Sequence, residues 1–557
     1  MKKGRWPVSG MVRAWRATAA AVAVGAVAGA DAAGVNLMLL GANNEWANSR
    51  AFTTLKPGKG YERQSWAYPG AYNNSAIHSN LRRLGITVHR YPGGSVGNHW
   101  DLEKGDVCEQ SLDCKIHPDC EFLKSIRDAK AACFPEEEFT VGAFYELVRD
   151  TDAAAILTLD VTDCEASLDS VQEFVRMARS ANVTLRVEIG NESYDPNQGP
   201  KPGGFRDGAE FVEKTRKYVT ALKEAGATVA VPVCPCPFFF NKPCWGGGES
   251  YAKWAHWNGN ISAAAADGSY PIDGLVAHNY PVDLLSFQQG NWKGASEFSE
   301  AYLSMPEATM MNADAQLETY PDGLTVWISE YNVQYAQLWG NATGPEADWL
   351  KATENSMMHG VHIAAHILSG ASREAVELMN YHTLFEVNPI SQPGFAMLAL
   401  NDDGAFIAPV AQIMGHISKT FHDFHAAGAE AHALHLLEGE RSQIVITALG
   451  QGNLPCLQAV AFCSPGRAAV LLLNRCDRAL PLDSLTDVIR TTAANEDLQF
   501  ISGVLYPGSL GIPGVTWANF DDQVGDPPWD APVPTKRSVG RLPEMDGTAF
   551  AIFEFHA

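Results

Sequence analysis

Short and almost continuous apolar runs recur eight times along the first three quarters of the chain. Continuous runs are typical of parallel strands covered on both faces, because a strand with one wet face alternates apolar and polar residues. The segments between them include residues 169–182 and 208–227, where apolar side chains recur three and four residues apart, as in amphipathic helices. Eight strand–helix alternations predict an α/β fold, a (β/α)8 TIM barrel. The runs begin at Val35, Ile86, Ala153, Val183, Ala227, Asp273, Leu324 and Glu374.

The pattern changes after about residue 425. Short alternating strands with turn signals replace the strand–helix repeat, which indicates an all-β sandwich domain. We therefore expect a catalytic barrel over residues 33–425 and a β-sandwich accessory domain over residues 426–557. Residues 102–140 and 281–322 are too long for plain connections, and we expect them to form loops that shape a site.

The N-terminus has the pattern of a secretory signal peptide over residues 1–32. Lys2, Lys3 and Arg5 give a basic start, an apolar stretch of small residues follows, and Ala28–Ala30 fits a cleavage site. The alternative is an uncleaved N-terminal anchor. No later segment has the length and apolarity of a membrane span. The prediction is a secreted, lumenal or cell-wall-associated protein without further membrane insertion.

Eleven cysteines fit an oxidising compartment and predict disulfide bonds. One cluster contains Cys108, Cys114, Cys120 and Cys133; a second contains Cys234, Cys236 and Cys244, and Cys164 stands alone. Zinc is the alternative for the first cluster because His117 lies within it, but the cluster has no Cys-x-x-Cys spacing, so we expect no metal. Glycosylation sequons, which predict a glycoprotein, stand at Asn73, Asn182, Asn260 and Asn341.

The net charge is strongly negative, with 41 Lys and Arg against 64 Asp and Glu, a balance of −23. Nucleic acids and anionic membranes repel such a surface, so neither is an expected partner.

Two carboxylates stand at strand ends on opposite sides of the expected barrel mouth. Glu192 follows Asn191 at the end of the fourth run, and Glu330 ends the seventh. Catalytic groups of such barrels lie at the carboxyl ends of the strands. Two facing carboxylates can hydrolyse a glycosidic bond, because one attacks the anomeric carbon while the other protonates the leaving oxygen and later activates water. A separation near 5 Å makes such an enzyme retaining.

The stretches "EIGNE" and "WISEYN" resemble the acid/base and nucleophile strand ends of clan A glycoside hydrolases. The stretches "HRYPGG" and "AHNY" are similar to the α-L-arabinofuranosidase and the endo-β-glucuronidase/heparanase families of that clan, which also carry a C-terminal β-sandwich. The resemblance spans residue 35 to the C-terminus. It implies that Glu192 is the acid/base and Glu330 the nucleophile.

The same resemblance implies a set of substrate-binding residues. Asn191 is expected to bond the sugar hydroxyl beside the anomeric carbon, and His278 or Tyr280 to orient the nucleophile, unless these two cap the core. Arg90 is expected either to contact substrate or to pair with Glu45. Further candidate subsite residues are Asn44, Asn332 and His382.

The sequence thus predicts a retaining glycoside hydrolase that acts by double displacement on a polysaccharide or glycoconjugate, most like an α-L-arabinofuranosidase. The alternatives are a β-glucuronidase/heparanase-like hydrolase and an inactive carbohydrate-binding barrel. A metal-dependent hydrolase is disfavoured because the first strand carries no His-x-His. No cofactor is expected.

Overall fold

A computed structural model describes residues 33–43, 84–117, 120–133, 140–162, 165–195, 205–235, 249–281, 294–333, 356–386, 397–401, 404–407, 409–434, 454–482, 484–508, 517–518, 536–540 and 547–557, with a few single residues between them. The predicted signal peptide and the sequons at Asn73 and Asn341 lie outside these residues. Within the described ranges, no helix is long and apolar enough to cross a lipid bilayer.

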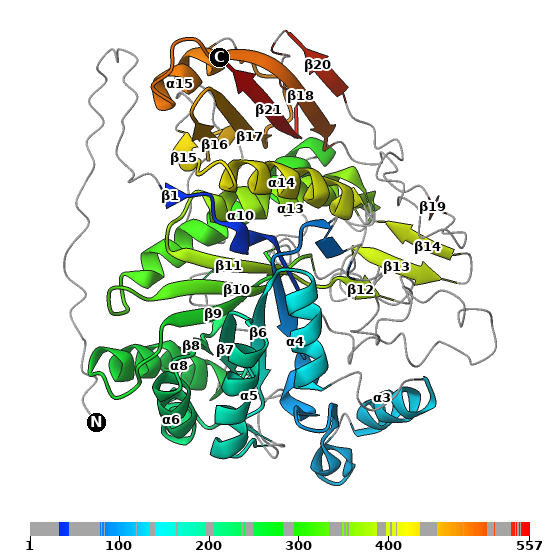
Figure 1. Cartoon of the computed structure of the whole chain (residues 1–557), viewed down its shortest axis with the longest axis vertical. Coiled ribbons are helices and arrows are strands. Elements are labelled where there is room, and N and C mark those ends of the chain that lie inside the picture. The colour runs from blue at the N-terminus through cyan, green and yellow to red at the C-terminus, as the bar shows by residue number, and fades with distance from the viewer. Residues whose placement is uncertain are drawn as a thin grey trace, which may run out of the picture.

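Eight parallel strands close into a barrel, which confirms the expected fold (Figure 1). Each of the eight apolar runs contains one barrel strand, and the strands follow one another around the barrel in chain order. They are β2 (Gly41–Asn43), β3 (Val88–Tyr91), β6 (Ala154–Leu159), β7 (Leu185–Ile189), β8 (Thr228–Pro232), β9 (Gly274–Asn279), β10 (Thr325–Tyr331) and β11 (Val376–Tyr381).

A helix follows each barrel strand from β3 onward. In order they are α4 (Val141–Asp150), α5 (Leu168–Ser180), α6 (Gly208–Glu224), α8 (Glu249–Ala266), α10 (Ala295–Leu317), α13 (Met357–Ala371) and α14 (Pro409–His425). The expectation that residues 281–322 form a loop was wrong for α10. This helix is buried on most sides, so its sequence lacks the one-sided apolar stripe that identifies a surface helix.

The barrel interior is closed by side chains. Val88, Ile156 and Trp327 belong to an apolar cluster that is separate from the main core. Arg90, two residues beyond Val88 on β3, and Glu188 on β7 are fully buried. Because side chains alternate along a strand, the charged pair forms a layer above the apolar one, toward the carboxyl ends of the strands.

Strand β10 carries a β-bulge just before Glu330. Trp327 pairs with Val276 on β9, and the next pair joins Glu330 to His278, so β10 uses three residues where β9 uses two. The register with β11 shifts at the same place. The extra residue resets the alternation of side chains, and Glu330 therefore points to the same side as Trp327, into the barrel.

The C-terminal part is an antiparallel β domain, as expected, stacked on the barrel beside α13 and α14 (Figure 1). Its sheet has the order β1-β15-β16-β17-β21-β18-β20. The strands are β1 (Ala33–Gly34), β15 (Glu430–Leu434), β16 (Leu457–Ser464), β17 (Arg467–Asn474), β18 (Gln499–Pro507), β20 (Lys536–Val539) and β21 (Ala549–His556).

The two faces of this sheet bury different partners. Phe462 and Leu471 belong to the main core together with the barrel helices. Val470 and Leu472, on the other face, pack with Ile489 of helix α15 (Leu485–Thr492). The sheet is thus buried on both faces. The barrel helices cover one face, and helix α15 packs against the other.

Smaller elements complete the described fold. A four-stranded sheet comprises β12 (Phe385–Glu386), β13 (Leu398–Asn401), β14 (Gly404–Ile407) and β19 (Trp517–Ala518). The segment after β3 contains the hairpin β4 (Trp100–Asp101) and β5 (Asp106–Val107), the 3-10 helices η3 (Ser95–His99) and η4 (Glu109–Leu112), and helix α3 (Cys120–Cys133). Residues 102–140 were expected to form a site-shaping loop, but their described part contains β5, η4 and α3.

Candidate active site

The chain turns sharply where β7 ends, and the turn presents Glu192. Gly190 and Glu192 both have positive φ, 74° and 44°. A Cβ atom on residue 190 would meet Ser193 Oγ at 2.3 Å, so this position requires glycine. The left-handed backbone at a glutamate costs about 1–2 kcal/mol. Such strain persists only where surrounding contacts hold it, and it concentrates at functional sites.

The Glu192 carboxylate reaches the barrel mouth and remains partly open to solvent, with 24% of its side chain exposed. Its Oε1 lies 2.8 Å from Nδ1 of His278 and accepts a hydrogen bond of 3.1 Å from the Tyr194 hydroxyl. Both of these contacts involve Oε1, so within the described residues the other carboxylate oxygen, Oε2, is available for substrate.

The Glu330 carboxylate is buried and held by donors on both oxygens. Arg90 Nη1 donates to Oε1 at 2.7 Å, and the Tyr280 hydroxyl donates to Oε2 at 2.6 Å. Burial alone would raise the pKa of Glu330. The charges of His278 and Arg90, together with the hydrogen bond from Tyr280, outweigh burial and hold this pKa well below its usual range, so the carboxylate is ionised at any physiological pH.

His278 stands between the two carboxylates. Its Nδ1 lies 2.8 Å from Glu192 Oε1 and 3.5 Å from Glu330 Oε2, while Nε2 lies 3.1 Å from Ser329 Oγ. Burial alone would lower the pKa of His278, but the charges of Glu330 and Glu192 raise it above its ordinary value. Because one nitrogen lies near both carboxylates, their nearest oxygens are no more than about 6.3 Å apart.

Arg90 forms the floor of the site. Its Nε and Nη2 donate to both oxygens of Glu188 at 2.7 and 2.8 Å, and Nη2 also donates to Asn191 Oδ1 at 2.7 Å. Glu188 and Glu330 are therefore the carboxylates that Arg90 pairs with, whereas Glu45 lies outside the described residues. Arg90 is fully buried beneath the mouth.

The remaining predicted residues lie in the wall beside Glu330. His382 Nδ1 accepts from Asn43 Nδ2 at 3.0 Å and lies 3.6 Å from Glu330 Oε2. Burial lowers the pKa of His382 to about 4, so this ring is neutral near pH 7. Asn332 donates to the His382 carbonyl and accepts from Nε2 of His359 at 2.9 Å, which ties its amide to the protein. Asn44 lies outside the described residues.

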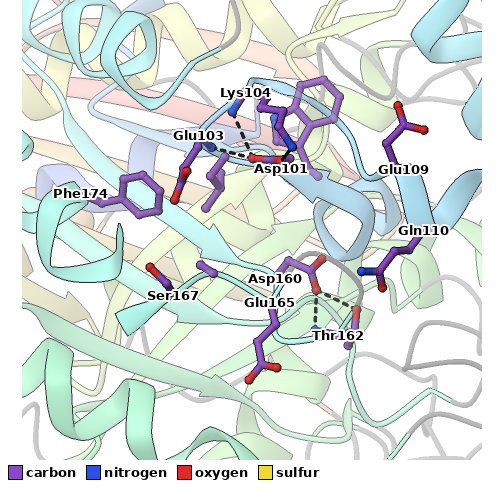
Figure 2. A pocket seen from close by; sticks show the side chains of 13 residues that line it. Asp101, Glu103, Lys104, Glu109, Gln110, Asp160, Thr162, Glu165, Ser167 and Phe174 are labelled. Carbon is purple, nitrogen blue, oxygen red and sulfur yellow. Dashed lines mark hydrogen bonds and ion pairs between the residues drawn. The ribbon is translucent and has the colours of Figure 1, made fainter. Parts of the chain in front are cut away.

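A cavity of about 450 Å³ opens between the β4–β5 hairpin and the loop after β6 (Figure 2). Acidic side chains dominate its polar lining; they are Asp101, Glu103, Glu109, Asp160 and Glu165. Lys104 is also at the cavity, and its ammonium donates to Asp101 at 2.7 Å. The surroundings of the barrel mouth on this side are therefore negatively charged.

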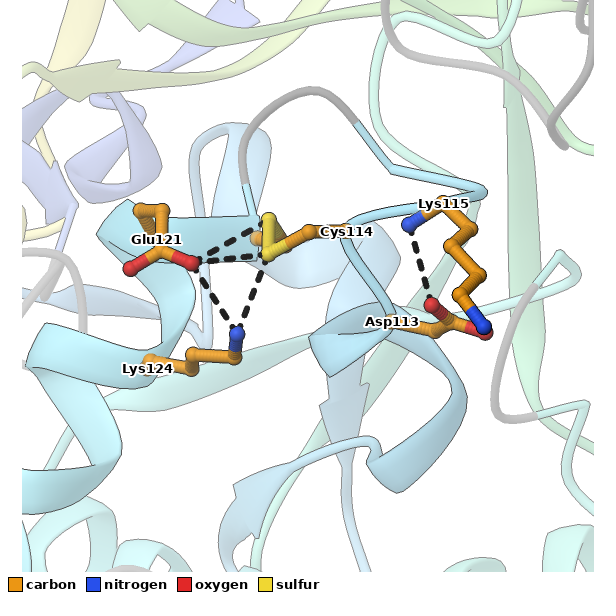
Figure 3. Close-up of a disulfide and its surroundings, with 6 residues drawn as sticks. Asp113, Cys114, Lys115, Glu121 and Lys124 are labelled. Atoms are coloured by element: carbon orange, nitrogen blue, oxygen red, sulfur yellow. Dashed lines mark hydrogen bonds and ion pairs between the residues drawn. A yellow bond between two sulfur atoms is a disulfide. The ribbon is translucent and has the colours of Figure 1, made fainter.

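A disulfide closes the segment beyond this cavity, between Cys114 and Cys120 (Figure 3). Cys108 is disulfide-bonded as well. The prediction of disulfides in this cluster is thus confirmed, and three of the four cysteines of the zinc alternative, Cys108, Cys114 and Cys120, are disulfide-bonded. A further disulfide joins Cys456 to Cys476 in the β domain.

The structure brings together Asn191, Glu192, His278, Tyr280, Glu330, Arg90 and His382 at one mouth. Sequence reasoning missed Glu188, Asn98 and Ser329, which contact this group. Glu188 was visible in principle, because it is a lone acidic residue within the apolar run that forms β7. Asn98 and Ser329 carry no comparable signal.

The fold is similar to that of solved arabinofuranosidases. A family 51 α-L-arabinofuranosidase from Bifidobacterium longum aligns over 94% of this chain and 97% of its own, with a TM-score of 0.61 and 15% identity. A family 51 arabinofuranosidase from Xanthomonas axonopodis pv. citri covers the same shares, with a TM-score of 0.56 and 14% identity. No family model and no curated protein matches the sequence. The likeness extends over both the barrel and the β domain, which agrees with the architecture expected from the sequence resemblance.

Proposed function

We propose that this chain is a retaining glycoside hydrolase of the α-L-arabinofuranosidase type. The observation that carries the proposal is that Glu192 and Glu330 both contact Nδ1 of His278 at the barrel mouth. The nearest oxygens are at most about 6.3 Å apart. This bound lies below the about 6.5–9.5 Å that an inverting enzyme needs and is compatible with the about 5–5.5 Å of a retaining enzyme.

The environments of the two carboxylates support different roles. Glu330 is ionised and fixed by Arg90 and Tyr280, so it attacks the anomeric carbon as the nucleophile. Glu192 is partly exposed and protonates the glycosidic oxygen as the leaving group departs. Glu192 then takes a proton from water, and the resulting hydroxide attacks the anomeric carbon and releases Glu330.

Asn191 supports the sugar beside the reacting carbon. Its Oδ1 is bound by Arg90, which fixes the orientation of the amide. Its Nδ2 is buried and has no hydrogen-bond partner within the described residues. A buried donor without a partner is costly unless a ligand accepts from it, and a sugar hydroxyl is such an acceptor.

A neutral sugar suits the charges around the mouth better than a uronic acid does. The guanidinium at the base of the mouth, that of Arg90, is engaged by Glu188, Glu330 and Asn191. The cavity beside the site is lined by acidic side chains, which would repel an anionic substrate. Two solved structures with a similar fold are arabinofuranosidases, which also supports a neutral furanoside.

The test is a panel of aryl glycosides that carry arabinofuranose, glucuronic acid, xylose or glucose. We expect hydrolysis of the α-L-arabinofuranoside, and nuclear magnetic resonance should detect the first-formed sugar with retained configuration. Glu330→Gln should reduce turnover at least about 10³-fold. Because it also removes a buried partner of Arg90, its melting temperature should fall, and circular dichroism should verify that the variant is folded at the assay temperature. Glu103→Gln is the matched control. Glu103 is an exposed glutamate of the neighbouring cavity, and this variant should keep its activity. An inverted product, or full activity of Glu330→Gln, contradicts the proposal.

We also propose that the protein works in an oxidising compartment outside the cytosol. The disulfides Cys114–Cys120 and Cys456–Cys476 support this location, since cytosolic reductants keep most thiols reduced. Secretion of the full-length protein into the medium of its native cells would test it, and retention in the cytosol would contradict it.

A further inference from the structure

The side chain of Asn98 holds the backbone of the residue that precedes Glu192. Asn98 comes from η3, in the segment after β3, and is fully buried. Its Nδ2 donates to the Asn191 carbonyl at 2.7 Å, and its Oδ1 accepts from the Asn191 amide at 2.9 Å. One carboxamide thus takes both backbone hydrogen bonds of Asn191, as a neighbouring strand would.

The turn needs such a partner because the barrel ladder ends just before it. The last register pair between β7 and β6 joins Ile189 to Leu159, and the Gly190 amide donates to the Leu159 carbonyl. The positive φ of Glu192 lies beyond this point. The Asn191 carbonyl belongs to the peptide plane that leads into Glu192, so a bond to this oxygen sets the direction in which the Glu192 side chain leaves the backbone.

The backbone of Asn98 contacts the segment that follows β6. The Thr162 hydroxyl lies 3.0 Å from the Asn98 carbonyl and 2.7 Å from the Asp160 carboxylate, and its one hydrogen is shared between these two acceptors. Asp160 follows directly on β6, the neighbour of β7. The position of Asn98 is therefore tied to the loop that follows β6.

We infer that Asn98 is a positioning residue that presents the Glu192 carboxyl group to the glycosidic oxygen. This inference rests on the proposed function, in which Glu192 is the acid/base. Asn98 does not touch the substrate; it acts through the Asn191–Glu192 peptide. The segment after β3 thereby contributes to proton transfer as well as to the wall of the cavity.

The experiment compares leaving groups in Asn98→Ala, with aryl α-L-arabinofuranosides as probes. A phenyl leaving group needs a proton, whereas a dinitrophenyl group departs without one. A displaced acid should therefore reduce kcat/KM about 10- to 100-fold for the phenyl glycoside and less than about threefold for the dinitrophenyl glycoside. Adding Asn98→Ala to Glu192→Ala should bring no further loss on the phenyl substrate, because both changes remove the same function.

Two further variants separate positioning from general loosening. Ser111→Ala removes another buried hydrogen bond of the same segment, to His99 at 3.1 Å, without touching Asn191, and should affect both leaving groups equally. If Asn98→Ala fails to fold, Asn98→Asp replaces it in the comparison. This variant keeps the side-chain volume and the acceptor for the Asn191 amide but removes the donor to the Asn191 carbonyl. Equal losses on both leaving groups in the Asn98 variants, or an additive loss in the double variant, would overturn the inference. If Glu192→Ala itself shows no leaving-group dependence, the proposed function fails instead.

Discussion

Arg90 and Glu188 form a bidentate ion pair that is fully buried beneath the barrel mouth, with N···O distances of 2.7 and 2.8 Å. The pair fixes the guanidinium plane so that Nη1 points at Glu330 Oε1. A planar guanidinium with two bound edges has little freedom, which is why arginine suits such a site. Glu188 thus orients the group that holds the proposed nucleophile.

We predict that Glu188→Gln lowers the stability of the protein more than the loss of a surface ion pair does. The substitution leaves the Arg90 charge buried with one partner fewer, which should lower the free energy of unfolding by about 3–5 kcal/mol. Urea unfolding measures it. The matched control is Glu109→Gln, which removes a carboxylate that is 81% exposed and pairs with Arg127, and it should change stability by less than about 1 kcal/mol. Similar values for the two variants would contradict the prediction.

Glu192→Ala should harm substrates unequally. Turnover of an aryl glycoside with a poor leaving group should fall by about 10²–10⁴-fold, because general acid catalysis is worth that much. Azide, which needs no base, should restore turnover of a good leaving group and give a glycosyl azide of retained configuration. Product analysis by mass spectrometry and nuclear magnetic resonance checks both results. If Glu192→Ala slows the hydrolysis of all substrates equally and azide restores no turnover, Glu192 is not the acid/base.

Tyr280→Phe should shift the pH dependence of the reaction. The Tyr280 hydroxyl donates to Glu330 at 2.6 Å and favours the ionised carboxylate, so its removal raises the pKa of Glu330. The acid limb of kcat/KM should then move to higher pH, by about one unit. Tyr194→Phe is the matched control, since that hydroxyl donates to Glu192 and not to Glu330. An unmoved acid limb in Tyr280→Phe would show that the hydroxyl does not stabilise the nucleophile.

The buried histidines of α13 should make the fold sensitive to acid. Burial lowers the pKa of His359 and of His362 to about 3, and that of His366 well below its ordinary value. Below about pH 6.5 the unfolded chain binds protons that the folded chain does not. The free energy of unfolding should therefore fall as pH drops, by about 1.4 kcal/mol per pH unit for each histidine.

Urea unfolding at about pH 7 and about pH 5 measures this slope, in a window above most carboxyl titrations. His366→Leu deletes one of the three titrating groups, together with a contact of 3.2 Å to His362. It should lower the stability at neutral pH by about 1–3 kcal/mol and yet flatten the pH dependence. An unchanged slope in His366→Leu would assign the acid sensitivity to other groups.

The barrel and the two carboxylates were predictable because both rest on local patterns. Parallel strands buried on both faces produce continuous apolar runs, and Glu192 and Glu330 stand where two of these runs end. The same continuity hides which side chains face inward, since no alternation marks them. The inward position of Glu188 was therefore missed, although an acidic residue inside an apolar run is itself a warning sign.

Other features depend on partners that are distant in the sequence. The bulge that turns Glu330 inward is defined only by the register of β10 with β9 and β11. Asn98 acts on Asn191, 93 residues away. Helix α10 was taken for a loop because both the barrel and the β domain bury it: the Asp477 amide of the β domain donates to Glu300 at 3.1 Å. Periodicity is a weak indicator of a helix that is buried on most of its sides.

The short strand β1 has a protective consequence. It pairs Ala33 with Ala431 and Gly34 with Glu430, and so covers the outer edge of β15. An uncovered sheet edge offers unpaired amides and carbonyls to other chains and promotes aggregation. Two residues from before the barrel thus shield a domain that is completed about 400 residues later. A recombinant form that begins at residue 35 would leave this edge open and should self-associate more readily than a form that keeps Ala33 and Gly34.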